Sequence, residues 1–280
     1  MIIDGHTHME SKLVNALKLK YLPVAVLWLD EKPADAVQFV PGRWGCVMAS
    51  FGTTAERGRS AAFDQETYGC WGGGVGLGFG NCYERFPGGV ACFCRFLSTG
   101  NETSEEGRAV AGQCAAWMRG SLQEEFLHGE RYRKSPEVVE QWLQGVPMMH
   151  VPSKYVVFKR LDDISADEQP VVIVFLVNPD QMSALVVMAN YAHRGSENVI
   201  IPHAAGCQTI GIFAYREARS AHPRAVVGLN DLSARKVVRK LGKDLVTVAV
   251  PYKLFQEMEA NVAGSFLEKE PWTTLAQSDP

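Results

Sequence analysis

The sequence predicts an α/β (or α+β) protein built from two related α/β repeats that pack about a pseudo-two-fold axis, with a helical insertion in the first repeat. Two observations support this prediction: short blocks recur in the same order, and each series opens with a β-branched run typical of a buried strand. The recurring blocks are PVAVLWL (23–29) with PVVIVFL (170–176), VMASF (47–51) with VMANY (187–191), GC (69–70) with GC (206–207), and VPSK (151–154) with VPYK (251–254).

The elements of the second repeat follow in order along the chain. After the strand at 170–176, the residues NPD are typical of a helix start and cap a predicted helix over 180–195. Further strands are predicted at 198–202, 225–229 and 245–250, and further helices at 233–241 and 253–262. Because strands and helices alternate, the pattern favours a mixed or parallel sheet.

Four regions follow from these elements. The first repeat is longer than the second because an insertion near residues 80–130 follows Cys70, and its part SEEGRAVAGQCAAWMRGSLQEEFL is typical of a helix with an apolar stripe. The predicted regions are an N-terminal extension with a helix (1–20), the first repeat with its insertion (21–160), the second repeat (168–262) and a C-terminal tail (263–280), whose last ten residues are expected to be disordered.

Composition excludes several classes of protein. The 280 residues are 46% hydrophobic and 21% charged with a net charge of -3, which is typical of a globular protein without a basic face for nucleic acid. The sequence contains no apolar run long enough to cross a membrane, and it does not start like a secretory signal. A cytoplasmic location is therefore expected, where the seven cysteines would be mostly reduced.

Three cysteines occupy positions that favour chemistry. Cys70 and Cys207 are equivalent in the predicted repeats and precede helices, and Cys46 directly precedes the helix that carries VMASF. Helix N-termini favour the thiolate, so the three sulfurs could hold an iron–sulfur cluster, or zinc as the alternative, with His203 as a further ligand. The competing interpretation is that the cysteines are buried apolar groups, because the sequence contains no CxxC pair.

The stretch YGCWGGGVGLGFGNC (68–82) does not match the GxGxxG fingerprint of dinucleotide-binding proteins. Gly72, Gly73 and Gly74 could form an anion-binding nest of backbone N–H groups, or the glycines could simply permit close packing. Ser233 and Arg235, at the start of a predicted helix, could hold an anion in the same way. The alternative there is that Asp231 or Ser233 only caps the helix.

His6 and His8 give a competing signal at the N-terminus. The segment IIDGHTH has the form of a strand that ends in a zinc-binding HxH pair, as in metal-dependent amidohydrolases. The remaining histidines do not mark further strand ends of such a barrel. The alternative is a polar N-terminal extension.

Several of these blocks together resemble the uncharacterised ArCR family, the domain-of-unknown-function family numbered 169. The resemblance rests on LPVAVLWL, GCVMASF, the CWGG segment, FLSTGN, NPDQMSALVVMANY, AAGCQ and VAVPYKLF. It implies a cytosolic setting, in an anaerobe, and draws attention to Cys46, Cys70 and Cys207, but it implies no substrate. Members of the family commonly have CPGG where this chain has Cys70-Trp71-Gly72-Gly73.

Three functional hypotheses follow. The first is a cytosolic iron–sulfur or metal-binding protein with a redox role, whose centre lies between the two repeats. The second is a small-molecule or anion-binding module without catalysis, and the third is a zinc-dependent hydrolase that uses His6 and His8. The partners that fit the first two are a small molecule, a redox partner or a second copy of the chain. The sequence assigns no catalytic residue, so it leaves open whether the protein is an enzyme.

Overall fold

Strands from both predicted repeats form one mixed, mostly antiparallel sheet of eight strands in the computed structural model, which describes residues 10–118 and 120–276. The strands are β1 (Val24–Leu29), β2 (Val37–Gln38), β3 (Ala61–Phe63), β4 (Tyr155–Arg160), β5 (Val172–Val177), β6 (Val199–Ile200), β7 (Ala225–Gly228) and β8 (Val246–Pro251). Their order across the sheet is β2-β3-β4-β1-β5-β8-β7-β6.

The two halves of the sheet have the same strand order when each is followed outward from the centre. One half runs β1, β4, β3, β2 and the other runs β5, β8, β7, β6. At the centre, β1 and β5 pair antiparallel, with Val24 opposite Val174. The outermost pairs, β2 with β3 and β6 with β7, are parallel, and every other pair is antiparallel. A mixed sheet was among the predictions, but the dominance of antiparallel pairs was not. Strands buried on both faces have the same continuous apolar pattern whatever their direction, so direction could not be inferred from it.

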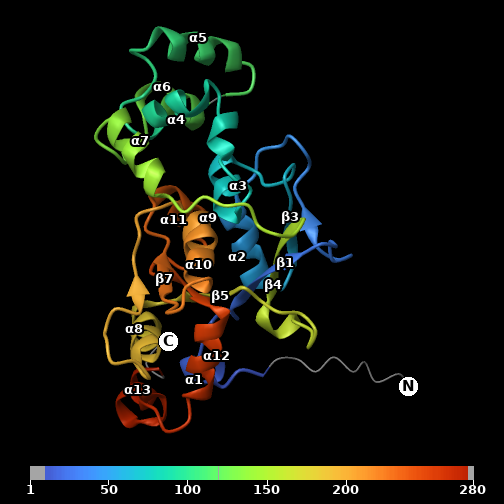
Figure 1. Ribbon diagram of the computed structural model, residues 1–280, viewed down its shortest axis with the longest axis vertical. Helices are drawn as coiled ribbons and strands as arrows, with labels where there is room; N and C mark the ends of the chain where they lie inside the picture. Colours follow the sequence, from blue (N-terminus) through green and yellow to red (C-terminus); the bar gives the residue numbers. More distant parts are fainter. Residues whose placement is uncertain (1–9, 119, 277–280) are drawn as a thin grey trace. The chain divides into compact units, whose positions relative to one another are not determined.

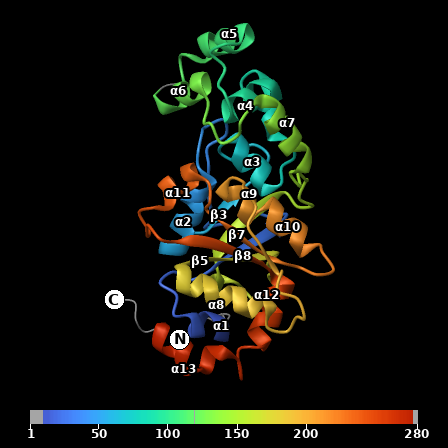
Figure 2. The same ribbon diagram turned by 90° about the vertical axis from the view of Figure 1, so that its left-hand side faces the viewer.

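Helices cover both faces of this sheet (Figures 1 and 2). One face, which includes Ala25, Leu27, Ile173 and Phe175, packs into the main apolar core. The elements on that side are α1 (Lys12–Leu17), α8 (Pro179–Asn190), α12 (Tyr252–Ala260), the 3₁₀ turn η3 (Phe266–Glu268) and α13 (Glu270–Leu275). The helices on the opposite side are α2 (Val47–Arg57), α3 (Trp71–Leu77), α9 (Gly206–Ile210), α10 (Ile212–Ala218) and α11 (Leu232–Val238).

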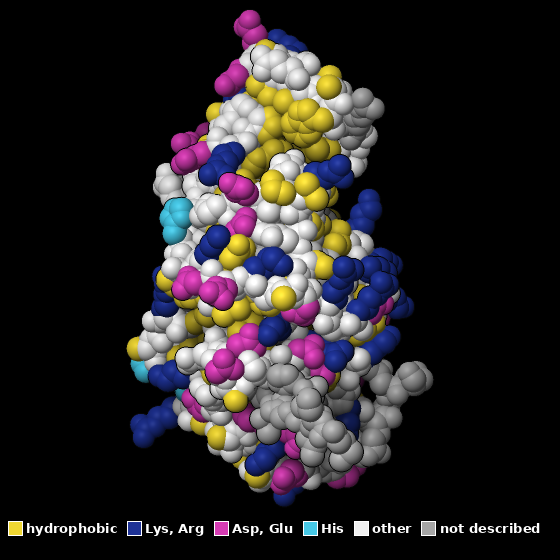
Figure 3. Space-filling view, turned by 90° about the vertical axis from the view of Figure 1, so that its right-hand side faces the viewer, with side chains coloured by type: hydrophobic (Ala, Val, Ile, Leu, Met, Phe, Trp, Pro, Cys, Tyr) yellow, Lys and Arg dark blue, Asp and Glu magenta, His cyan; other side chains and the backbone are white. Residues whose placement is uncertain are grey.

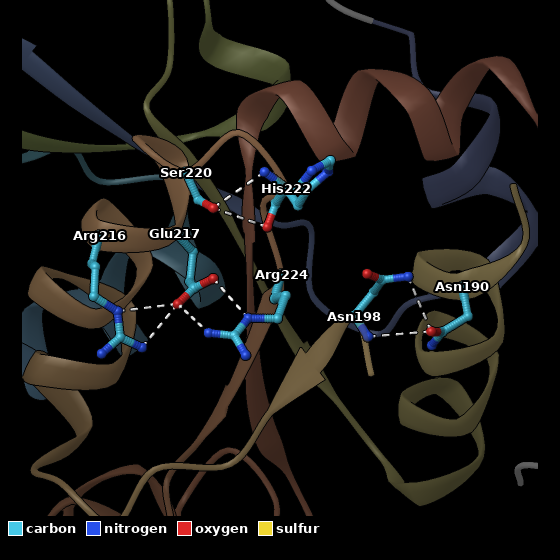
Figure 4. A network of polar contacts seen from close by, with 7 residues as sticks. All are labelled: Asn190, Asn198, Arg216, Glu217, Ser220, His222 and Arg224. Carbon is cyan, nitrogen blue, oxygen red and sulfur yellow. Dashed lines mark hydrogen bonds and ion pairs between the residues drawn. The ribbon is translucent and has the colours of Figure 1, made fainter. Parts of the chain in front are cut away.

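Polar side chains start these helices and fasten them to the sheet. The predicted cap of α8 is confirmed as a capping box, in which Asn178 and Gln181 each accept a hydrogen bond from the other's backbone N–H. Beyond the end of α10, Arg224 donates to the buried carboxylate of Glu217 at 2.9 Å, which joins that helix to the start of β7 (Figure 4). Among the described residues, no helix has the length and apolar character needed to cross a membrane.

The predicted disorder of the last ten residues is wrong for residues 271–276, the part of them that the structure describes. Residues 266–268 and 270–275 are helical, and Trp272 is buried. The indole N–H of Trp272 donates to the carbonyl oxygen of Ala16 at 2.9 Å, so this segment packs on α1. A short polar segment with a single anchoring tryptophan gives little periodic signal in sequence, which explains the error.

Gly80–Met148 forms a second compact unit, and Met1–Phe79 with Met149–Pro280 forms the unit that holds the sheet. The second unit includes the insertion predicted near 80–130 and extends beyond it. Its elements are η1 (Cys82–Arg85), α4 (Gly89–Leu97), α5 (Glu105–Cys114), α6 (Ser121–His128) and α7 (Pro136–Gly145). The helix predicted over 104–127 is thus divided in two, and α6 begins after Gly120, whose φ of 60° suits glycine.

Candidate functional site: thiols at the starts of four helices

The starts of α2, α3, α9 and α11 come together on one side of the sheet. Helix α9 packs against α2, α3 and α11, and α11 also packs against α2. The approach of α3 to α9 is close enough to require glycine: a Cβ on Gly76 would lie 2.7 Å from the carbonyl carbon of Cys207. The close packing proposed for the glycine run is therefore observed at this position.

Cys70 and Cys207 bind to the same peptide group of α3. Cys70 is the N-cap of that helix, and its sulfur accepts a hydrogen bond from the N–H of Gly73 at 3.2 Å. The thiol of Cys207, in the first turn of α9, donates to the carbonyl oxygen of Gly72 at 3.2 Å. The Gly72–Gly73 peptide thus connects two cysteines that are far apart in sequence.

Cys46 completes a set of three neighbouring thiols. It is the N-cap of α2, is half-buried, and makes no side-chain cap hydrogen bond. A charge on Cys46 would raise the pKa of both Cys70 and Cys207, so its thiol lies within electrostatic range of theirs. The structure therefore brings together the three cysteines that the sequence analysis selected.

The predicted thiolate character is not seen in this structure. Burial raises the pKa of Cys70 to about 11, although the N–H of Gly73 acts in the opposite direction. Burial also raises the pKa of Cys46, and it raises the pKa of Cys207 well above its usual value. The loss of hydration raises the pKa of these thiols more than the helix N-termini lower it, so the three groups are neutral thiols at neutral pH.

Asp231 is a further member of the site that the sequence analysis treated only as a cap. It is the N-cap of α11 and accepts hydrogen bonds from the N–H of Ala234 at 2.7 Å and the N–H of Gly206 at 2.5 Å. Its carboxylate therefore joins the starts of α11 and α9. Burial raises the pKa of Asp231, and a positive charge on His203 would lower it, which places His203 near this carboxylate. His203 is itself exposed.

The anion-binding residues predicted at two helix starts have other contacts. Gly72 to Gly74 lie in the first turn of α3, where the N–H groups of Gly73 and Gly74 donate to Cys70. The guanidinium of Arg235 donates to the carbonyl oxygen of Lys243 at 2.9 Å, and Ser233 lies exposed in the first turn of α11. Anion binding by either group of residues stays a prediction.

A preformed site for a single metal ion is absent from the part of the chain that the structure describes, since no three His, Cys, Asp or Glu side chains are arranged to hold one. His6 and His8, the predicted zinc pair, lie outside the described residues. Cys92 and Cys94, two further thiols with CxC spacing, are buried in α4 of the second unit.

These features define a class of protein: an α/β fold with helices on both faces of a mixed sheet and a thiol-rich site at the helix starts on one face. More specifically, the chain belongs to the uncharacterised ArCR family, domain of unknown function 169, whose family model matches residues 12–261. No curated protein and no solved structure is significantly similar to the chain. The family resemblance inferred from the sequence blocks is thereby confirmed.

Proposed function

We propose that Cys46, Cys70 and Cys207 bind an iron–sulfur cluster and that this site gives the protein a redox role. The observation that supports the proposal best is the contact of Cys70 and Cys207 with the two ends of one peptide group, with Cys46 in electrostatic range of both. Three thiols from three separate helices at one place are unusual for a purely apolar core. When bound, the cluster would supply one-electron transfer.

The donor set favours a cluster over zinc, the alternative cofactor. A single zinc ion needs thiolates about 2.3 Å from one point, and the described residues include no such group. A cluster carries its cysteine ligands on separate iron atoms, so the sulfurs do not have to meet at one point. Three cysteines leave one position for another ligand. The carboxylate of Asp231 lies within electrostatic range of Cys46 and Cys207, and the exposed His203 lies within range of that carboxylate.

Cluster binding would change the protonation of the site. The raised pKa values mean that the free thiols hold their protons at neutral pH, whereas thiolates are the form that binds iron. Binding should therefore release protons and become weaker as the pH falls. The N–H of Gly73, which already donates to Cys70, would then stabilise a coordinated sulfur.

Anaerobic reconstitution tests the proposal. The full chain is purified under anaerobic conditions and supplied with iron and sulfide, and bound iron, bound sulfide and the visible absorption spectrum are measured. Cys70→Ser and Cys207→Ser should each lose most of the bound iron and sulfide. Cys114→Ser is the matched control, because Cys114 is also half-buried but lies in the second unit, and it should keep both.

A colourless protein with no iron or sulfide above trace after reconstitution would contradict the proposal. Equal loss in the Cys114→Ser control would also contradict it, because binding would then not depend on these three cysteines. Uptake of zinc alone, lost in the Cys70 and Cys207 variants, would instead support the zinc alternative.

We also propose that the two halves of the sheet arose by duplication and are related by a pseudo-two-fold axis between β1 and β5. The matching strand order supports this. It suggests a different correspondence from the predicted pairing of Cys70 with Cys207. Helix α2 lies between β2 and β3 as α9 lies between β6 and β7, so Gly45-Cys46 would correspond to Gly206-Cys207.

By the same order, α3 corresponds to α11, so Cys70 corresponds to Asp231. Both are N-caps whose side chains accept from the third helical residue, Gly73 in one case and Ala234 in the other. The candidate site would then consist of two equivalent pairs of helix starts. An experimental structure in which β1 to β4 failed to superpose on β5 to β8 by a rotation of about half a turn would contradict this relation.

A further inference from the structure

A hollow beside α11 is lined by positive charge. It has a volume of about 190 Å³, and its charged lining residues are Arg235, Lys236, Arg239 and Lys243, with no aspartate or glutamate among the lining residues. Apolar side chains, including those of Leu229 and Leu232, form the rest of the wall. The hollow therefore combines a cationic side with an apolar side.

Arg235 gives this hollow its shape. Its guanidinium donates to the carbonyl oxygens of Leu229 at 3.1 Å, Leu245 at 3.4 Å and Lys243 at 2.9 Å. These bonds hold the turn after α11 against the segment before it. Because the guanidinium already donates to backbone carbonyls, Arg235 adds positive charge to the hollow and holds its wall in place. It does not offer a free set of donors to a ligand.

The other three cations remain available. Lys236, Arg239 and Lys243 are exposed, and none forms an ion pair with a carboxylate of the described residues. Figure 3 shows Lys and Arg side chains gathered along one edge of the face that it draws. The whole chain has a net charge of -3, so this is a local excess of positive charge.

The helix dipole explains only part of this arrangement. Cations near the end of a helix interact favourably with its carbonyl groups, which accounts for Arg239, the C-cap of α11. It does not account for Lys243, which lies beyond the helix, or for the side chains that converge on one hollow. Like charges brought this close repel one another unless an anion lies between them.

We propose that this hollow binds the phosphate group of a small phosphorylated metabolite. Lys236, Arg239 and Lys243 would contact the phosphate oxygens through charge-assisted hydrogen bonds. The apolar side, with Leu229 and Leu232, would contact the carbon skeleton of the same molecule. This site is separate from the proposed cluster site, and its test does not depend on iron or sulfide.

Calorimetric titration of the full chain tests this proposal. The probes are inorganic phosphate and glycerol phosphate, with sodium chloride added to keep the ionic strength constant. The double variant Lys236→Gln/Arg239→Gln should bind both probes at least about tenfold more weakly, because it loses charge-assisted hydrogen bonds. Lys240→Gln is the matched control: Lys240 is an exposed neighbour that does not line the hollow, and its affinity should change by less than about threefold.

Several results would overturn the proposal. One is an absence of saturable binding of either probe, and another is an equal loss of affinity in the Lys240→Gln control, which would show only a diffuse charge effect. Binding of single-stranded DNA that is tighter than phosphate binding and falls steeply with salt would assign the surface to nucleic acid instead. Unchanged urea denaturation of the double variant shows that any lost affinity is not caused by unfolding.

Discussion

The cysteines of the two units share a residue type but have different surroundings. Cys92 and Cys94 are buried in α4 with Phe93 and Phe96, and the sulfur of Cys92 accepts a hydrogen bond from the guanidinium of Arg95 at 3.2 Å. Cys46, Cys70 and Cys207 instead lie at helix starts, next to backbone N–H and C=O groups. Burial alone therefore does not separate the two groups of thiols, whereas the position at a helix start does.

The strongest test of this comparison removes the carboxylate that joins two helices of the thiol site. Asp231→Ala leaves the buried N–H groups of Gly206 and Ala234 without their acceptor. We expect the free energy of unfolding to fall by about 2–4 kcal/mol, the sum of a lost cap and a buried unsatisfied donor. Urea denaturation followed by circular dichroism measures this change.

Asp231→Ser is the matched control, because serine keeps an acceptor for Ala234 but is too short to serve Gly206 as well. It should lose about half as much stability as the alanine variant. If both variants were as stable as the wild type, the carboxylate would not be what joins α9 to α11.

Five of the eight strands, β1 and β5 to β8, could be predicted from the sequence, whereas β2, β3 and β4 and the pairing of the strands could not. PVAVLWL and PVVIVFL became β1 and β5, because β-branched runs with both faces buried have a clear apolar pattern. The VMASF and VMANY blocks, by contrast, do not occupy equivalent places. The first starts α2 and the second ends α8, which lies between different strands. Short matching blocks show only that two segments have similar residues. Whether the segments occupy equivalent places in the two halves depends on the strand order.

The three cysteines of the site could also be selected from the sequence, because each lies at or next to the start of a helix. Asp231 could not be recognised as their neighbour, since an aspartate before a helix is fully explained as a cap. Its second hydrogen bond, to Gly206, depends on the approach of α9 to α11, which is a tertiary contact. The protonation state of the thiols could not be predicted either. Burial raises the pKa of Cys70, and the extent of that burial depends on how the helices pack.

A hydroxyl in place of the Cys94 thiol, in the second unit, should be costly. Cys94 is 6% exposed, and Cys94→Ser would bury a hydroxyl where the thiol behaves as an apolar group. We expect a loss of about 1–3 kcal/mol in the free energy of unfolding, measured by urea denaturation. Cys94→Ala, which adds no polar atom, should cost less than the serine variant. The reverse order would mean that the surroundings of Cys94 are polar and that the two groups of cysteines do not differ.

The smallest change in the free energy of unfolding is expected at Cys46, where the sign of the change matters more than its size. Cys46 is an N-cap with extended backbone angles that makes no side-chain cap hydrogen bond, and serine is among the best N-cap residues. In the protein without any bound cofactor, Cys46→Ser should therefore raise the free energy of unfolding by about 0.5–1 kcal/mol, measured by urea denaturation. Cys46→Ala is the control, because alanine has no side-chain acceptor and should not stabilise the helix. A stabilising serine would mean that the thiol is not the best side chain for this fold at this position, as expected for a residue that serves a site. A serine variant less stable than the wild type would instead place Cys46 with Cys94, as a thiol that contributes mainly by packing.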